Sequence, residues 1–380
     1  MSRIKAMVVF ILAIFAFSCN QDSIFHDISN EPEPKTALIP GSPTNMAVLK
    51  NQLYVGSRMG SRIFCFSNMN GTLGWSVITL PEGSLGELAT DGSYLYALVF
   101  PGGNPMNFSI IKRYDVTTKI WGKDFIIEDY SIQTLFGAGG TIFAGARKKS
   151  DSQNYEIIYL DVSSNSHVII KYGTSLLTGA ARDNSGNIYL STAGSGVFLY
   201  SGNSLGASAV SGTEDENIQG IISAGNTIIA VGNSNVFSSS GGTSFNSFQT
   251  GFTFTGAMCV WRDRNNSFSP SLLLMGIRGK SSSIVHGYRE MILSNSAGDI
   301  FTIKNPGDDS PTSVINRAKY NASIGTHPIE SILQVPDISE GGPIDYSAFS
   351  GNSEWEPLIF ACTSKSGLWS YRNGEWNAEE

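Results

Sequence analysis

The chain repeats a short apolar phrase: an aliphatic residue, an aromatic or aliphatic residue, another aliphatic residue and a small residue. The phrase begins at Leu53, Leu95, Ile142, Ile188, Ile228, Leu273 and Ile359. The first five intervals are 42, 47, 46, 40 and 45 residues. A short continuous apolar run is typical of a strand that is covered on both faces. The pattern therefore predicts one buried strand in every repeat.

Shorter runs precede and follow each phrase, separated by turns such as Asp91-Gly92 and Gly139-Gly140. The run before each phrase is rich in small residues, which suits a crowded centre, and we predict innermost strands at 45–50, 86–91, 132–137, 178–182, 219–224, 256–261 and 330–335. Four short strands every ~40–50 residues are the pattern of a β-propeller. We therefore predict an all-β fold, a seven-bladed β-propeller of four-stranded antiparallel blades.

The last interval is irregular, at 86 residues. We attribute its length to a polar linker at 306–328 and an insertion at 337–356. The alternative is an eighth blade whose second strand begins at Met291, but no innermost strand is available for it. The runs at 367–371 and 375–377 supply third and fourth strands for the last blade. Ring closure is therefore predicted to need no exchanged N-terminal strand.

The N-terminus has the pattern of a secretion signal, because Arg3 and Lys5 precede 11 apolar residues at 7–17. A membrane-spanning helix needs about 20 such residues. The run ends at Ala16-Phe17-Ser18-Cys19, which resembles the lipobox of bacterial lipoproteins, although that family favours Leu where this chain has Ala16. The resemblance implies cleavage before Cys19 and acylation of its thiol. The alternative is an ordinary secretory peptide with an incidental cysteine.

These patterns divide the chain into a signal peptide at 1–18, a lipidated Cys19 with a flexible tether at 19–43, and the propeller at 44–380. The predicted location is the extracytoplasmic side of a cell membrane, with the lipid bilayer as a partner through acylated Cys19. Outer and inner membranes both stay open. Cleavage would leave 23 basic and 32 acidic residues. A net negative domain argues against binding nucleic acid by bulk charge.

Composition fits a large β core, since 41% of residues are hydrophobic and only 15% are charged, with 41 glycines. Low charge and abundant glycine suit many short strands and tight turns. Cys65, Cys259 and Cys362 each lie in an apolar run. Buried thiols are predicted there, and one disulfide among them is the alternative.

The segment Ser238-Ser239-Ser240-Gly241-Gly242-Thr243-Ser244-Phe245 resembles the Asp-box of sialidase-type propellers, with Ser240 where the Asp belongs. Looser versions end at Trp75 and Trp376. The resemblance implies that each aromatic side chain packs between two blades. It implies no catalysis.

No catalytic, phosphate-binding or metal-binding motif is recognisable, and the four histidines are scattered. A sialidase would need a cluster of three arginines, which the strand assignment does not supply. The acidic run at 214–217 lacks the glycine spacing of a calcium loop, so a solvated turn is preferred. No enzyme activity, cofactor or metal is predicted.

Basic residues gather in the predicted loops between second and third strands, which lie on one face of the ring. We call the following set the basic rim: Arg58, Arg62, Arg147, Lys148, Lys149, Arg278, Lys280 and Arg289, with Lys365 in the corresponding loop of the last blade. Chance is the alternative, since loops are polar in any case. If the rim is real, it predicts an anionic ligand or envelope protein as partner.

The preferred function is therefore a binding or scaffold module in the cell envelope. The alternative is an envelope glycan-active enzyme, a hydrolase or lyase, with an unrecognised site at the channel mouth. Fold alone does not choose between them.

Overall fold

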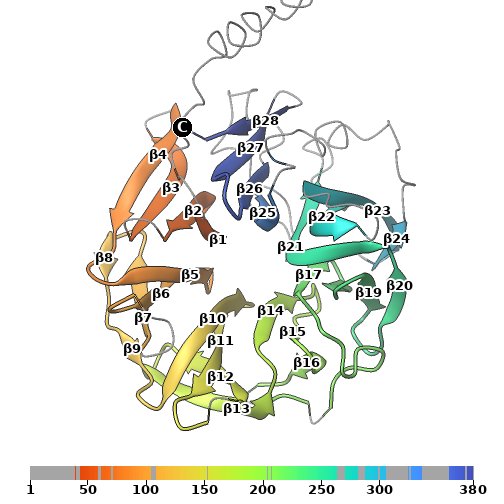
Figure 1. Cartoon of the computed structure of the whole chain (residues 1–380), viewed down its shortest axis with the longest axis horizontal. Coiled ribbons are helices and arrows are strands. Elements are labelled where there is room, and N and C mark those ends of the chain that lie inside the picture. The colour runs from red at the N-terminus through yellow and green to blue at the C-terminus, as the bar shows by residue number, and fades with distance from the viewer. Residues whose placement is uncertain are drawn as a thin grey trace, which may run out of the picture. The chain divides into compact units, whose positions relative to one another are not determined.

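The regular structure consists of seven antiparallel sheets, each made of strands that follow one another in the chain (Figure 1). The computed structural model describes residues 39, 43–58, 61–69, 72–103, 108–151, 153–202, 204–206, 208–262, 270–280, 287–297, 300–304, 324, 327–335, 359–372 and 375–379. The chain divides into two units, 1–36 with 380, and 37–379. All sheets belong to the second unit, which is described by itself.

The first four sheets, which we call blades 1 to 4, span the N-terminal half of the ring. Blade 1 comprises β1 (Pro43–Leu49), β2 (Gln52–Ser57), β3 (Arg62–Met69) and β4 (Thr72–Thr79). Blade 2 comprises β5 (Ser84–Thr90), β6 (Leu95–Phe100), β7 (Ile110–Asp115), β8 (Ile120–Trp121) and β9 (Phe125–Ile126). Blade 3 comprises β10 (Tyr130–Ala138), β11 (Thr141–Lys148), β12 (Tyr155–Asp161) and β13 (Ser166–Thr174). Blade 4 comprises β14 (Leu177–Arg182), β15 (Ile188–Thr192) and β16 (Gly196–Tyr200).

The remaining three sheets complete the ring. Blade 5 comprises β17 (Gly220–Ala224), β18 (Thr227–Val231), β19 (Asn235–Ser240) and β20 (Asn246–Gln249). Blade 6 comprises β21 (Phe252–Arg262), β22 (Pro270–Lys280), β23 (Gly287–Ala297) and β24 (Ile300–Lys304). Blade 7 comprises β25 (Ile329–Gln334), β26 (Ile359–Thr363), β27 (Leu368–Arg372) and β28 (Glu375–Ala378).

The innermost strands contact one another in the cyclic order β1, β5, β10, β14, β17, β21, β25 and back to β1 (Figure 1). This closed order confirms the seven-bladed propeller. The eight-bladed alternative is wrong, because Met291 lies in β23, the third strand of blade 6. Blade 7 takes all four strands from the C-terminal part of the chain. The ring therefore closes without strand exchange, as predicted.

Blade 4 departs from the prediction of four strands, because its sheet has three. The segment that follows β16 is rich in Ser and Gly, which are poor strand formers. It still bonds the edge of β16, through Gly206 N to Leu199 O at 3.0 Å and Val210 N to Val197 O at 2.7 Å. An irregular segment thus covers the edge that a fourth strand would pair.

Blade 2 departs in another way, because its outer strand is split into β8 and β9, which both pair with β7. Lys112 in β7 is only 5% exposed. Its Nζ lies 2.8 Å from Asp124, between β8 and β9, and 3.2 Å from Glu82. A buried ammonium group must be paired. The break in the outer strand brings the Asp124 carboxylate to it.

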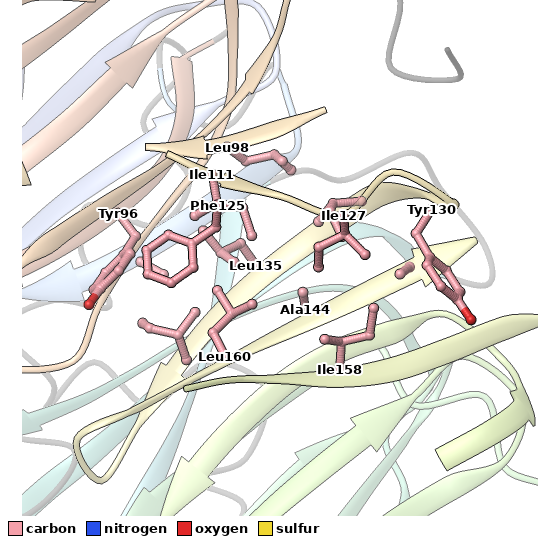
Figure 2. Packing of buried hydrophobic residues seen from close by; sticks show 14 of the residues in the cluster. Tyr96, Leu98, Ile111, Phe125, Ile127, Tyr130, Leu135, Ala144, Ile158 and Leu160 are labelled. Carbon is pink, nitrogen blue, oxygen red and sulfur yellow. The ribbon is translucent and has the colours of Figure 1, made fainter. Parts of the chain in front are cut away.

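The core lies between blades rather than inside any one of them. Figure 2 shows the layer between blades 2 and 3, where Tyr96 and Phe125 of blade 2 face Leu135 and Leu160 of blade 3. Second strands are buried along nearly their whole length, as in β6 and β15. The repeated apolar phrase is therefore explained by neighbours on both faces of each blade.

The three Asp-box-like aromatics pack between blades, as their resemblance implied. Phe245 of blade 5 joins the cluster that contains Tyr189 of blade 4. The Trp376 ring lies 5.8 Å from that of Tyr288 in blade 6, and the Trp75 ring lies 6.2 Å from that of Phe360 in blade 7. Each aromatic therefore contacts the preceding blade.

Cys65, Cys259 and Cys362 are buried thiols without a disulfide, as predicted. Burial raises the pKa of the Cys362 thiol well above its usual value. The signal peptide, Cys19, the tether up to residue 38 and the insertion at 337–356 lie outside the described residues, as does most of the linker at 306–328.

Candidate functional site

The seven innermost strands enclose a central channel with a volume of about 620 Å³. Every innermost strand contributes to its wall, including Asn45 of β1, Glu87 of β5, Thr178 of β14 and Glu330 of β25. Ligand sites typically measure ~300–1,000 Å³. The channel is thus large enough for a small molecule.

The innermost strands of six blades carry a β-bulge near the end where they begin. The register shifts at Pro43/Met46, Leu85/Leu88, Ile132/Thr134, Leu177/Gly179, Phe254/Met258 and Ile329/Ser331. A bulge inserts an extra residue and changes the direction of a side chain. These bulges place polar residues at one mouth of the channel, which we call the bulge mouth.

Hydrogen bonds at the bulge mouth join successive blades. The bonds run from Asn45 Nδ2 to Leu88 O (2.6 Å), Leu135 N to Glu87 Oε2 (2.7 Å), Thr134 Oγ1 to Leu177 O (2.9 Å), Thr178 Oγ1 to Ile218 O (2.8 Å), Thr255 Oγ1 to Ile329 O (2.5 Å) and Met46 N to Ser331 Oγ (3.4 Å). Between blades 5 and 6 the backbones meet directly, since a Cβ on Gly220 would lie 2.2 Å from Gly256 O.

Glu87 differs from the other side chains that form these bonds between blades. Its side chain has a carboxyl group, whereas the others have amide or hydroxyl groups. Burial is the main influence, and it raises the pKa of Glu87 to about 7. The bond from Leu135 N and the charge of Arg58 act in the opposite direction. A carboxyl group that titrates near neutral pH can donate or accept a proton under physiological conditions.

An Arg stands two residues after a Gly of the second strand in three blades: Gly56 and Arg58 in blade 1, where Arg58 directly follows the strand, Gly145 and Arg147 in blade 3, and Gly276 and Arg278 in blade 6. Each Gly lies against the next blade. A Cβ on Gly145 would lie 2.9 Å from Leu177 Cβ, and one on Gly56 would lie 2.4 Å from Leu85 Cδ2. Because strand residues two apart share a face, Arg147 and Arg278 also face the next blade. The charge of Arg58 acts on Glu87 of blade 2.

The structure places most of the basic rim on the face of the bulge mouth. Arg58, Arg62, Lys148, Lys149, Arg278 and Lys365 are exposed, and Arg147 is half-buried. Lys280 ends β22, on the same face. Lys149 is engaged locally, since its Nζ donates to Glu128 O at 2.6 Å. Whether this rim binds a partner stays a prediction.

Arg289 does not belong to the exposed rim and corrects the prediction. It is 3% exposed, and its guanidinium lies 5.0 Å from the centre of the Phe252 ring. Arg289 follows Tyr288 inside β23 rather than standing in the preceding loop. Because β23 begins at Gly287, Arg289 lies within the strand and its side chain packs in the interior against Phe252.

Glu87 was missed by the sequence interpretation, and so was the repeated Gly-x-Arg pattern. Glu87 stands in the segment Ser84–Thr90, whose sequence does not mark the bulge at Leu85/Leu88 that places Glu87 at the channel mouth. The Gly-x-Arg pattern was visible, since it occurs at the same offset in three copies of the apolar phrase.

Among the described residues, no group of three or more His, Cys, Asp and Glu side chains is placed to hold a metal ion. Nor does any helix in the described ranges have the length and apolar character of a membrane span.

Comparison with known proteins gives the class of fold. No protein-family model matches the chain, and no curated protein matches it in sequence. The WD40 propeller domain of Doa1 is similar in structure, with a TM-score of 0.52 and 11% identity over 91% of this chain and 95% of that one. A proposed gluconolactonase aligns with a TM-score of 0.42 and 12% identity over 70% of this chain and 90% of that one. The protein is thus a seven-bladed β-propeller, and the likeness shows the fold alone.

Proposed function

We propose that this protein is an extracytoplasmic lipoprotein, anchored in a cell membrane through acylated Cys19, whose propeller is a binding or scaffold module of the cell envelope. The observation that supports the binding role is the channel of about 620 Å³, whose bulge mouth carries the carboxyl groups of Glu87 and Glu330 from two different blades. The anchor rests on Cys19 directly after the 11-residue apolar run. Two or more acyl chains would hold the domain stably at the bilayer.

The anchor is tested by replacing Cys19 with Ala and growing cells with labelled palmitate. The variant should lose the label and move from the detergent phase to the aqueous phase of a partition experiment. Cys65→Ala is the matched control, because this thiol is buried in blade 1 and should not be acylated. Label that persists in Cys19→Ala would refute the anchor.

The second candidate is an envelope glycan-active enzyme, and Glu87 is the observation in its favour. Its carboxyl group lines the channel, and burial raises its pKa to about 7. Many hydrolases and lyases use a carboxyl group of that kind as general acid or base. Turnover of envelope glycans by the wild type, lost in Glu87→Gln, would favour this candidate over a binding module. No turnover by either protein would favour the module.

A further inference from the structure

Two junctions of the ring, between blades 3 and 4 and between blades 6 and 7, are built from matching residues. In the first, Thr134 Oγ1 donates to Leu177 O at 2.9 Å, and Gly145 lies against both residues. In the second, Thr255 Oγ1 donates to Ile329 O at 2.5 Å, and Gly276 lies against that pair. The two sites therefore share the same arrangement of a glycine, a threonine hydroxyl and a backbone carbonyl of the next blade.

An arginine extends the match. Arg147 follows Gly145 by two residues, and Arg278 follows Gly276 by two. Both side chains therefore leave the second strand on the face that meets the next blade. In the next blade, the corresponding position is the residue directly after the aliphatic residue that bonds the threonine. This residue is Thr178, after Leu177, in blade 4 and Glu330, after Ile329, in blade 7.

The two junctions differ in the residue at this position. Arg278 Nη2 lies 4.0 Å from Glu330 Oε1, so a carboxylate of the protein itself faces the guanidinium. At the matching place Thr178 is neutral, and its hydroxyl donates to Ile218 O of blade 5 at 2.8 Å. Within the described part of the chain, no carboxylate lies within ion-pair distance of Arg147, which is half-buried.

We propose that the junction between blades 3 and 4 is a binding site for a carboxylate-bearing ligand, with Arg147 as its anchor. The ligand carboxylate would take the place that Glu330 holds at the junction between blades 6 and 7. A guanidinium matches a carboxylate through two parallel N–H donors, which a lysine does not offer.

Neighbouring groups suit such a ligand. Lys148, the next residue of β11, projects from the opposite face of the strand, so Arg147 rather than Lys148 supplies the positive charge at this junction. Ser175 precedes β14, and Ser195 lies in the turn between β15 and β16, so both stand at the bulge-mouth face of blade 4. Their hydroxyl oxygens lie 3.1 Å apart. This inference deepens the proposed binding role by naming the ligand chemistry, and it does not depend on Cys19.

The test follows arginine Nε signals by NMR in the purified full chain, held in a polyoxyethylene detergent. D-Glucuronate is the probe, and D-glucose at equal ionic strength is its neutral counterpart. Arg147→Lys assigns the Arg147 signal by its disappearance. That signal should shift with glucuronate, saturating on the order of 1 mM or above, as for a single exposed anion contact. Glucose should leave it in place, and Arg278 should not respond.

Two variants exchange the residue types at positions 178 and 330 between the two junctions. Glu330→Thr removes the internal carboxylate from an exposed position, so Arg278 should begin to respond to glucuronate. Thr178→Glu supplies a carboxylate to Arg147 and should abolish its response. Thr178→Glu also loses the bond to Ile218 O, so Glu330→Thr carries the test if that variant fails to fold.

Three results would overturn the proposal. One is an Arg147 signal that does not move with glucuronate, and another is a shift of the Arg58 and Arg278 signals in the wild type that is as large as that of Arg147. The third is an Arg147 signal that moves with inorganic phosphate and not with glucuronate. Each would leave acylation of Cys19 untouched, so failure here is distinguishable from failure of the lipoprotein assignment.

Discussion

Among the side chains that form hydrogen bonds between blades at the bulge mouth, Glu87 has the group that is most costly to bury in its charged form. Its Oε2 accepts a hydrogen bond from Leu135 N at 2.7 Å, which a hydroxyl or amide oxygen would accept equally well. Ionising a carboxyl group that is partly shielded from water costs free energy. Five bonds at other junctions use Asn, Thr or Ser side chains. The carboxyl is therefore not required for holding two blades together, which makes Glu87 a candidate for contact with a ligand.

Glu87→Gln should change how stability depends on pH. A folded-state pKa of about 7 lies above the ~4.3 of a free Glu, so the folded protein binds this proton more tightly than the unfolded chain. The resulting stability is fully present below about pH 4 and is lost as the pH rises to about 7. Wild type should lose about 1–2 kcal/mol more than Glu87→Gln over this range, since channel water screens part of the effect.

The comparison is made by urea unfolding of both proteins at pH 4.5 and pH 8. Glu330→Gln is the matched control, because it removes an exposed carboxyl from a corresponding bulge and should follow the wild type. A difference between wild type and Glu87→Gln that is equal at both pH values would contradict the assignment.

At the scale of the strands, two of the bulges in the innermost strands depend on glycines in the second strands. Opposite the bulge of β10, Gly145 leaves room for Thr134 and for Leu177 of the next blade. Gly276 does the same for Thr255 and Ile329. The glycine permits two blades to approach closely, and the threonine then bonds the neighbouring backbone.

Gly145→Ala should disrupt this approach. The new Cβ would lie 2.4 Å from Thr134 Oγ1 and 3.2 Å from Leu177 N, so the backbones of two blades must separate. We expect a loss of about 2–3 kcal/mol in the free energy of unfolding, as for other overpacked sites. Gly122→Ala is the control, because its nearest atom is the flexible Arg113 side chain at 3.3 Å. Equal melting temperatures for the two variants would refute the role of Gly145.

The strands were predictable because each second strand is buried on both faces, which imposes a continuous apolar run such as Leu95–Phe100. The missing fourth strand of blade 4 was not, since irregular backbone bonds the edge of β16 through Gly206 and Val210. Most of the basic rim was predictable because topology alone assigns loops to a face. Arg289 was not, because its burial depends on β23 beginning at Gly287, before Arg289. Glu87 required the bulge, and a bulge leaves no clear mark in sequence.

At the scale of the whole propeller, the ring closes where blade 7 meets blade 1. Phe66 and Trp75 of blade 1 pack on Phe360 of blade 7, with Phe66 and Phe360 ring centres 5.4 Å apart. Glu379 follows the last strand and is 2% exposed. Its carboxylate accepts a hydrogen bond from Trp75 Nε1 at 3.0 Å and another from the Ser370 hydroxyl. A residue beside the C-terminus thus bridges the first and last blades of the ring.

Glu379→Ala should therefore weaken the whole ring rather than one blade. Hydrogen bonds to a charged group contribute about 1.5–3 kcal/mol, and the indole N–H of Trp75 would lose its acceptor. We expect a loss of about 2 kcal/mol in the free energy of unfolding, measured by urea denaturation, with the transition still cooperative. Trp75→Phe alone should cost a similar amount, and the double variant should cost clearly less than the sum, because both changes remove one bond. Additive losses would show that Glu379 and Trp75 stabilise the ring independently, and the closing bond would then have no special part in holding blade 7 to blade 1.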